Sequence, residues 1–113
     1  MAIIEQGGLI FNGSTTIGTV NIAPYSIIGN GLTTVPTAGT SVALATSTAV
    51  KTVTIRALSS NTGLVYVGSS SVSSANGFEL SPQETVSLDL DNLNKVWLDV
   101  QVNGEGVSFI YLA

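Results

Sequence analysis

Carboxylates are the side chains in this sequence with the greatest capacity for chemistry. The chain has seven Asp and Glu residues, three Lys and Arg residues, and neither His nor Cys. The common acid–base and thiol mechanisms therefore have no candidates. Two carboxylate pairs could act as in glycosidases: Glu79 with Glu84 across a turn, and Asp89 with Asp91 on one strand face. We interpret all four as solvent-facing charges that keep strand edges soluble, and we expect no enzyme.

The stretch DLDNLN, residues 89–94, begins like a calcium-binding loop. It lacks the glycine at the sixth position and the distal glutamate of an EF-hand. Its first residue also continues a regular strand alternation, so its neighbours cannot wrap around an ion. Glycine-rich pieces such as SANG and VNGEG have no phosphate-loop pattern and no following helix, which makes them hairpin turns. We expect no metal and no cofactor, with a structural calcium ion at this strand end as the alternative.

Trp97 is the candidate for recognition by an aromatic side chain. It lies between inward-facing residues of a predicted strand, so it points to the opposite face. An outward Trp on a surface with few charges is a protein contact or a ligand platform. We favour the protein contact, with Tyr66 as a second candidate. Asp99 and Gln101 are neighbours of Trp97 on that face and could hydrogen-bond a sugar, so a carbohydrate-binding module stays open, with Tyr111 as a further platform residue.

Charge limits the partners that this chain can have. The net charge is -4, and the only basic residues are Lys51, Arg56 and Lys95. Binding to nucleic acid or to an anionic membrane surface relies on Lys and Arg, so neither is expected. No apolar stretch approaches the roughly 20 residues of a spanning helix. The N-terminus lacks the basic start of a secretory signal, so we expect synthesis in a cytoplasm without export by that route.

The elements that must position these residues are short strands. Turn formers separate alternating segments about every 8–12 residues, which is typical of an antiparallel sandwich or barrel. In residues 85–91, for example, Val86, Leu88 and Leu90 face inward and Ser87 faces outward. Strands are predicted over residues 50–58, 64–68, 78–80, 85–91, 95–102 and 107–113. The sequence predicts an all-β, jelly-roll-like antiparallel sandwich of about eight strands.

The first part of the chain has a less regular pattern. Residues 8–13, 16–23 and 40–46 could each be strands, whereas residues 24–40 contain two prolines and resemble an extended connector. We place a boundary near residue 40. Residues 1–40 are then an extended N-terminal arm that packs on a neighbour, and residues 41–113 are the compact sandwich. The alternative is one sandwich that includes both parts. Four apolar residues of the arm are candidate protein contacts: Ile3, Ile4, Leu9 and Phe11.

Residues 52–113 include NTGLVYVG, an Asn-Gly turn into GFEL, and SPQETVSLDL before two closing strands. This pattern resembles a small β-sandwich of bacteriophage virion proteins, most closely head decoration (cement) and head-fibre proteins. Such domains commonly have Pro-Gly-Glu where this chain has Pro82-Gln83-Glu84, a departure that leaves the turn intact.

The resemblance implies a structural protein on the outside of a phage capsid. Its partners would be the major capsid protein and further copies of itself, most simply as a trimer. No nucleic acid, membrane or small-molecule ligand is expected. A tail or fibre-tip component is the alternative position in the virion, since head, tail and fibre proteins share this sandwich.

Overall fold

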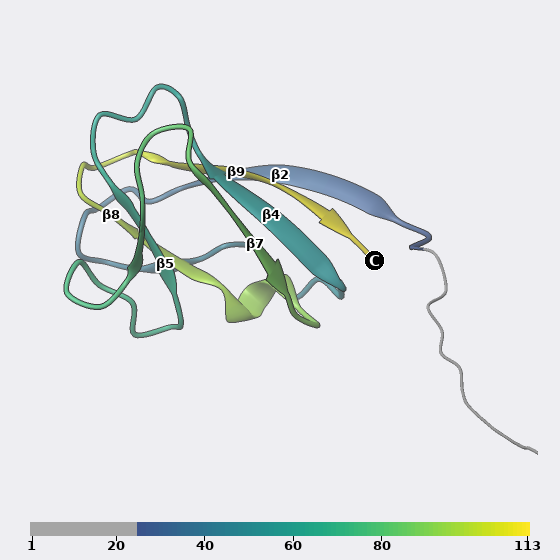
Figure 1. The fold of residues 1–113 in the computed structure, drawn as a ribbon. Coiled ribbons are helices and arrows are strands. Elements are labelled where there is room, and N and C mark those ends of the chain that lie inside the picture. The colour runs from purple at the N-terminus through teal and green to yellow at the C-terminus, as the bar shows by residue number, and fades with distance from the viewer. Residues whose placement is uncertain (1–24) are drawn as a thin grey trace, which may run out of the picture.

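The computed structural model describes residues 25–113, which form eight strands in two antiparallel sheets of four strands each (Figure 1). The first sheet has the order β2 (Ile28–Thr34), β9 (Gly106–Leu112), β4 (Thr52–Ala57), β7 (Thr85–Asp89). The second has the order β3 (Val42–Ala43), β8 (Trp97–Val100), β5 (Val65–Gly68), β6 (Phe78–Leu80), and a 3-10 turn η2 (Leu93–Lys95) precedes β8. The predicted all-β antiparallel fold of about eight strands is confirmed. Within residues 25–113, no helix is long and apolar enough to span a membrane.

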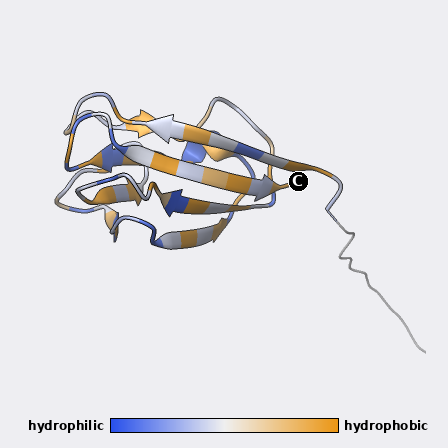
Figure 2. Ribbon diagram, turned by 90° about the horizontal axis from the view of Figure 1, so that it is seen from above, coloured by the Kyte–Doolittle hydropathy of each residue, from blue (hydrophilic) through white to orange (hydrophobic). Residues whose placement is uncertain are grey.

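Strand alternation decides which residues enter the space between the sheets. In β4, Val53 and Ile55 are fully buried, and their register partners in β7 are Leu88 and Val86. The intervening threonines of β4 lie on the outer face, where Thr54 Oγ1 is 2.8 Å from the Ser87 hydroxyl. Hydrophobic and hydrophilic residues alternate along these strands in Figure 2. The residues of 85–91 that were predicted to face inward therefore do face the core.

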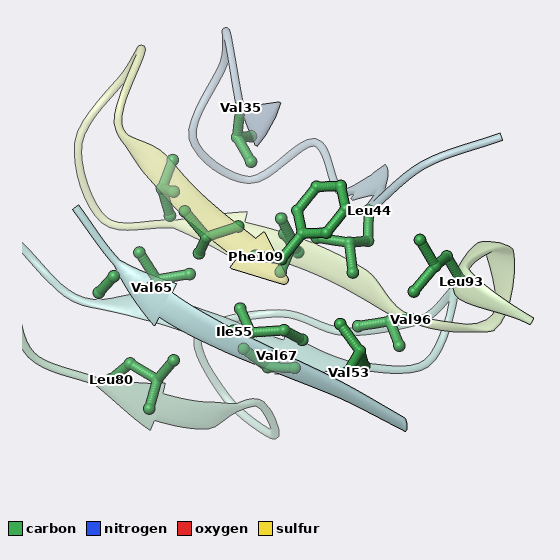
Figure 3. Packing of buried hydrophobic residues seen from close by; sticks show 14 of the residues in the cluster. Val35, Leu44, Val53, Ile55, Val65, Val67, Leu80, Leu93, Val96 and Phe109 are labelled. Carbon is green, nitrogen blue, oxygen red and sulfur yellow. The ribbon is translucent and has the colours of Figure 1, made fainter. Parts of the chain in front are cut away.

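The core lies between the sheets and is aliphatic with one aromatic ring. Figure 3 shows part of this core, to which Ile55 and Phe109 come from the first sheet and Val65 and Val67 from the second. The buried cluster consists of Val35, Leu44, Val50, Val53, Ile55, Ala57, Val65, Val67, Leu80, Leu93, Val96, Leu98, Val100, Val107 and Phe109. Branched side chains of this kind suit the pleated inner surfaces of two strand layers.

β2 differs from the expectation of an extended connector over residues 24–40. It pairs with β9 along seven residues, from Ile28 opposite Leu112 to Thr34 opposite Gly106. The residues of β2 therefore belong to the same sandwich as the strands β3 to β9. They precede residue 40, where the sandwich was expected to begin. Residues 1–24, with the contact candidates named in them, lie outside the described residues.

Two of the three residues on the inner face of β2 are glycines, and the rings of β9 cover them. A Cβ atom on Gly29 would lie 2.2 Å from the Tyr111 ring, and one on Gly31 would lie 2.5 Å from the Phe109 ring. The two rings stack with their centroids 6.5 Å apart. An aromatic side chain on the neighbouring strand thus supplies the apolar cover that a glycine cannot. This arrangement explains why a strand forms where the sequence has Gly-Asn-Gly.

Candidate protein-contact surface

The four carboxylates considered for catalysis are all on the surface. Glu79, Asp89 and Asp91 are exposed, as is Glu84, whose Oε1 accepts a 2.8 Å hydrogen bond from the Ser81 N–H. Asp91 Oδ1 lies 2.8 Å from Lys95 Nζ, and both side chains are exposed. In residues 25–113, no group of three or more His, Cys, Asp or Glu side chains is placed to hold a metal ion.

The hydrogen bond from Lys95 and its positive charge hold the pKa of Asp91 below its ordinary value. An exposed pair of this kind contributes little to stability, because water and salt screen it. Asp91 precedes the turn η2 and Lys95 is its last residue. The backbone of this segment already has partners, since the Leu93 N–H donates to the Thr48 carbonyl at 3.0 Å. The predicted strand end thus forms a tight turn closed by an ion pair.

Asp99, expected on an outward face beside Trp97, is buried with only 2% of its surface exposed. Its Oδ1 accepts 2.8 Å hydrogen bonds from the N–H groups of Gly39 and Val100. The loop of residues 35–41 covers it, so its carboxylate fixes this loop to the second sheet and is not available to a sugar. The alternation gave its face correctly, but it could not show that a loop lies over that face.

Tyr66 is also covered, with 5% exposure, and this burial removes it from the contact surface. The turn that ends at Gly77 packs on it so closely that a Cβ there would lie 2.4 Å from the Tyr66 Cβ. Trp97 is half-buried on the same outer face, paired in register with Ala43 and Gly68. Tyr111 lies in the other sheet, so the three candidate platform aromatics do not form one surface.

Five of the seven large apolar side chains that are exposed among the described residues lie on and beside β2. We call this surface the β2 stripe. It comprises Tyr25, Ile27, Ile28, Leu32 and Ile110, with exposures of 52%, 56%, 69%, 63% and 47%. Ile28, Leu32 and Ile110 share the outer face of the first sheet. Ile110 is the register partner of Asn30, which lies on that face of β2 between Ile28 and Leu32. Lys51 Nζ lies 5.6 Å from the centroid of the Tyr25 ring at one end of the stripe.

β2 is also an edge strand, because its only strand partner among the described residues is β9. Edge strands are usually protected from pairing with other chains by charges, proline or bulges. β2 has none of these, and residues 25–50 contain no charged side chain. The alternate spacing of Ile28, Asn30 and Leu32 could have indicated a strand with this exposed face. The glycines between them favoured an interruption of strand structure instead.

A second apolar surface opens at the opposite edge, where β7 and β6 end their respective sheets. A cavity of about 480 Å³ lies there between the two sheets. We call it the β7 groove. It is lined by Val67, Gly68, Ser69, Phe78, Val86, Leu88, Asp89, Leu90, Lys95 and Val96. Phe78 is 60% exposed at the rim, although its register partner Val67 is a core residue.

No protein-family model, curated protein or solved structure matches this chain. The function is therefore argued from the two apolar surfaces and the fold. Both surfaces lie at sheet edges, where an added strand or a neighbouring molecule can continue the contacts of the sandwich. Contiguous exposed apolar side chains of this kind mark protein interaction sites.

Proposed function

We propose that this protein is a structural virion protein, a decoration (cement) protein that binds the outer surface of a phage head and stabilises it. The β2 stripe carries this proposal, because a charge-free edge strand with exposed large apolar residues is a surface for another protein. The resemblance of residues 52–113 to virion sandwiches supports the same reading. The protein would associate with itself, most simply as a trimer at threefold positions of the shell.

Strand order supports a jelly roll as the finer description of the fold. Counted from the first described strand, the two sheets have the orders 1-8-3-6 and 2-7-4-5. A jelly roll is a double-sheet architecture of eight strands, and viral capsid domains use it. Lectin domains use it as well, so the fold alone does not separate the two functions.

Stabilisation of the shell would follow from mass action. A protein that binds the assembled shell but not its disordered alternatives adds its binding free energy, about 2.7 kcal/mol per site at a free concentration of 100 Kd. The β2 stripe is suited to this contact because burial of uncharged residues has a small desolvation penalty. Beside it, the hydroxyls of β4 and β7 offer hydrogen bonds to the same partner.

Capsids prepared without the protein, from the phage that encodes it, test this proposal. We expect purified protein to sediment with them and to raise their disruption temperature. The double variant Leu32→Ser, Ile110→Ser should lose sedimentation while its own melting temperature changes little. Val102→Ser, at a 39% exposed apolar residue outside the stripe, is the matched control. A wild-type protein that does not bind capsids would contradict the proposal.

A carbohydrate-binding module is the second candidate, favoured by the half-exposed Trp97 and by the use of jelly rolls in lectins. The burial of Asp99 and Tyr66 leaves Trp97 without the partners expected for a sugar site. Glycan-array binding that is lost in Trp97→Ala would favour this candidate over decoration.

A further inference from the structure

The β7 groove exposes side chains that belong to an inner face. Val86, Leu88 and Leu90 face the second sheet, yet all three are only partly buried. Val67 and Val96 beneath them are almost fully buried, so they form the floor of the groove. Its volume of about 480 Å³ is in the range of built binding sites in proteins, and its walls are mainly apolar.

The backbone of β7 is available beside this groove. The pairs that continue the β4–β7 ladder at its two ends are bonded through even-numbered residues: the Ala57 N–H donates to the Glu84 carbonyl, and the Leu90 N–H donates to the Lys51 carbonyl. The parity changes only beyond these pairs, where the Gln83 N–H donates to the Ala57 carbonyl and the Val50 N–H donates to the Asp91 carbonyl. In an antiparallel ladder the alternate residues direct their N–H and C=O groups to the other side. A strand added at Ser87 would therefore find free partners and would place alternate side chains over the groove.

Residues 1–24 have the composition of such an occupant. Their only charged side chain is Glu5, and eight residues are large and apolar. These are Ile3, Ile4, Leu9, Ile10, Phe11, Ile17, Val20 and Ile22. Two dozen residues can extend to roughly 80 Å, which is far more than the width of the sheet.

The point where this segment meets the sandwich lies across the first sheet from the groove. The N–H groups of Ser26 and Ile27 both donate to the Ala113 carbonyl at 2.8 Å. Ile28, at the start of β2, lies level with Asp89, at the end of β7. The strands β9 and β4 lie between these two residues in the sheet. The two ends are three strand spacings apart, about 14 Å. Grooves of the same molecule and of a neighbour are thus both within reach.

Strand direction favours the neighbour. β7 runs toward the end of the sheet at which residues 1–24 join it. If residues 1–24 of the same molecule lay along β7, their chain would also run toward that end. The segment would therefore be parallel to β7. All strand pairs among the described residues are antiparallel, and parallel pairing is slightly less stable per residue. A rotated second copy can supply the segment in the antiparallel direction.

We propose that the β7 groove binds the apolar side chains of residues 1–24 of a second copy of this chain, which adds to the free edge of β7 as a strand. This inference deepens the proposed function, because it rests on self-association and names the contact that produces it. The β2 stripe then stays free for the capsid partner.

Complementation between two full-length variants tests the exchange. Leu9→Asp with Phe11→Asp damages the segment and leaves the groove intact. Ser87→Pro blocks the free edge of β7 and leaves the segment intact, and proline is tolerated on edge strands. We expect wild type to be oligomeric by light scattering, each variant to be monomeric, and their equimolar mixture to form dimers. Ser87→Ala is the matched control and should remain oligomeric.

Two results would overturn the proposal. An aspartate double variant that keeps the wild-type oligomer size would show that the segment makes no contact between copies. Monomeric variants that fail to form dimers when mixed would place the occupant in its own groove. Capsid sedimentation is measured separately from segment exchange. If copies exchange residues 1–24 but the protein does not sediment with capsids, only the decoration function is contradicted.

Disulfide cross-linking covers the case in which Ser87→Pro does not fold. The chain has no native cysteine, so single substitutions report one contact. Leu9→Cys and Phe78→Cys, placed on separate full-length chains, should form a covalent heterodimer on oxidation. A Glu79→Cys chain, whose side chain alternates to the other face of β6, is the control and should cross-link at least tenfold less. Equal yields from the two chains would overturn the proposed contact.

Discussion

Gln83 has a backbone φ of 74°, the only positive value among the described non-glycine residues. It is the third residue of a four-residue turn in which the Glu84 N–H donates to the Ser81 carbonyl at 2.9 Å. Type II turns require a positive φ at this position, and glycine adopts it most easily. The resembling virion domains commonly have glycine here. The departure noted in the sequence is thus a locally strained residue in an unchanged turn.

Gln83→Gly should therefore stabilise the protein. Relief of the left-handed strain, about 1–2 kcal/mol, exceeds the conformational entropy that glycine loses on folding, about 0.5–1 kcal/mol. We expect the unfolding free energy in urea to rise by about 0.5–1 kcal/mol. Gln83→Ala retains a Cβ and should show no gain. Equal midpoints for the two variants would show that φ at this turn has no energetic consequence.

Glu105 connects two turns through its carboxylate. It accepts hydrogen bonds from the Thr62 N–H at 2.7 Å, the Thr62 hydroxyl at 2.8 Å and the Gly63 N–H at 3.0 Å. Burial raises the pKa of Glu105, but these three hydrogen bonds outweigh that effect and hold the pKa below its ordinary value of 4.5. Its ionised form is therefore favoured in the folded protein.

This lowered pKa predicts a loss of stability in acid. A carboxyl group with a lower pKa in the folded state stabilises fully above its unfolded pKa. That contribution is lost as the pH falls below about 4.5 and through the lowered folded value. Melting temperatures between pH 6 and pH 3 should fall less steeply for Glu105→Gln than for wild type. Parallel curves would show that Glu105 makes no contribution to the pH dependence.

At the scale of elements, β2 depends on the rings of its neighbour. Gly31→Ala should destabilise the sandwich, because the new Cβ would lie 2.5 Å from the Phe109 ring and force it out of place. Overpacking of this kind costs about 1–3 kcal/mol. Asn30→Ala, on the exposed face of the same strand, is the control and should change the unfolding free energy by less than about 0.5 kcal/mol. A tolerated Gly31→Ala would mean that β2 moves to accommodate the methyl group.

Strands with regular alternation were predictable from the sequence, whereas the glycine-containing β2 and the loops that cover outer faces were not. The predicted segment 78–80 matches β6, and 85–91 contains β7 with Leu88 on the predicted face. β2 was missed because its inner face is completed by side chains some 80 residues later in the chain. The burial of Tyr66 has the same kind of cause, since it depends on a turn that packs over its face.

The apolar surfaces were only partly accessible to sequence reasoning. The low fraction of charged residues, 9%, made assembly plausible but did not require it, and it does not say where contacts would lie. The β7 groove is formed by residues of three strands and a turn, a combination that no local pattern encodes. Leu88 was predicted to face inward, and its partial burial in the structure agrees with its place in the wall of this groove.

At the scale of the whole molecule, association and folding should be separable. Among the described residues, the buried cluster lies within residues 35–109, so a deletion of residues 1–23 leaves this cluster in the chain. We therefore expect the melting temperature to fall by only a few degrees, while oligomer formation or capsid sedimentation weakens at least tenfold. Calorimetry and light scattering on the truncated protein measure the two effects. A truncated protein that cannot fold, or one that associates like wild type, would contradict this separation.

The position of β9 in the middle of the first sheet has a consequence during synthesis. A ribosome makes β2, β4 and β7 before β9, yet β9 is the strand that joins β2 to β4. At about 5–20 residues per second, the roughly 70 residues between β2 and β9 take on the order of ten seconds to translate. For that interval β2 has no partner within its own sheet and the nascent chain keeps both of its edges free. The first sheet can therefore close only after residues 106–112 have left the exit tunnel, and the apolar side chains of β2 are open to chaperones until then.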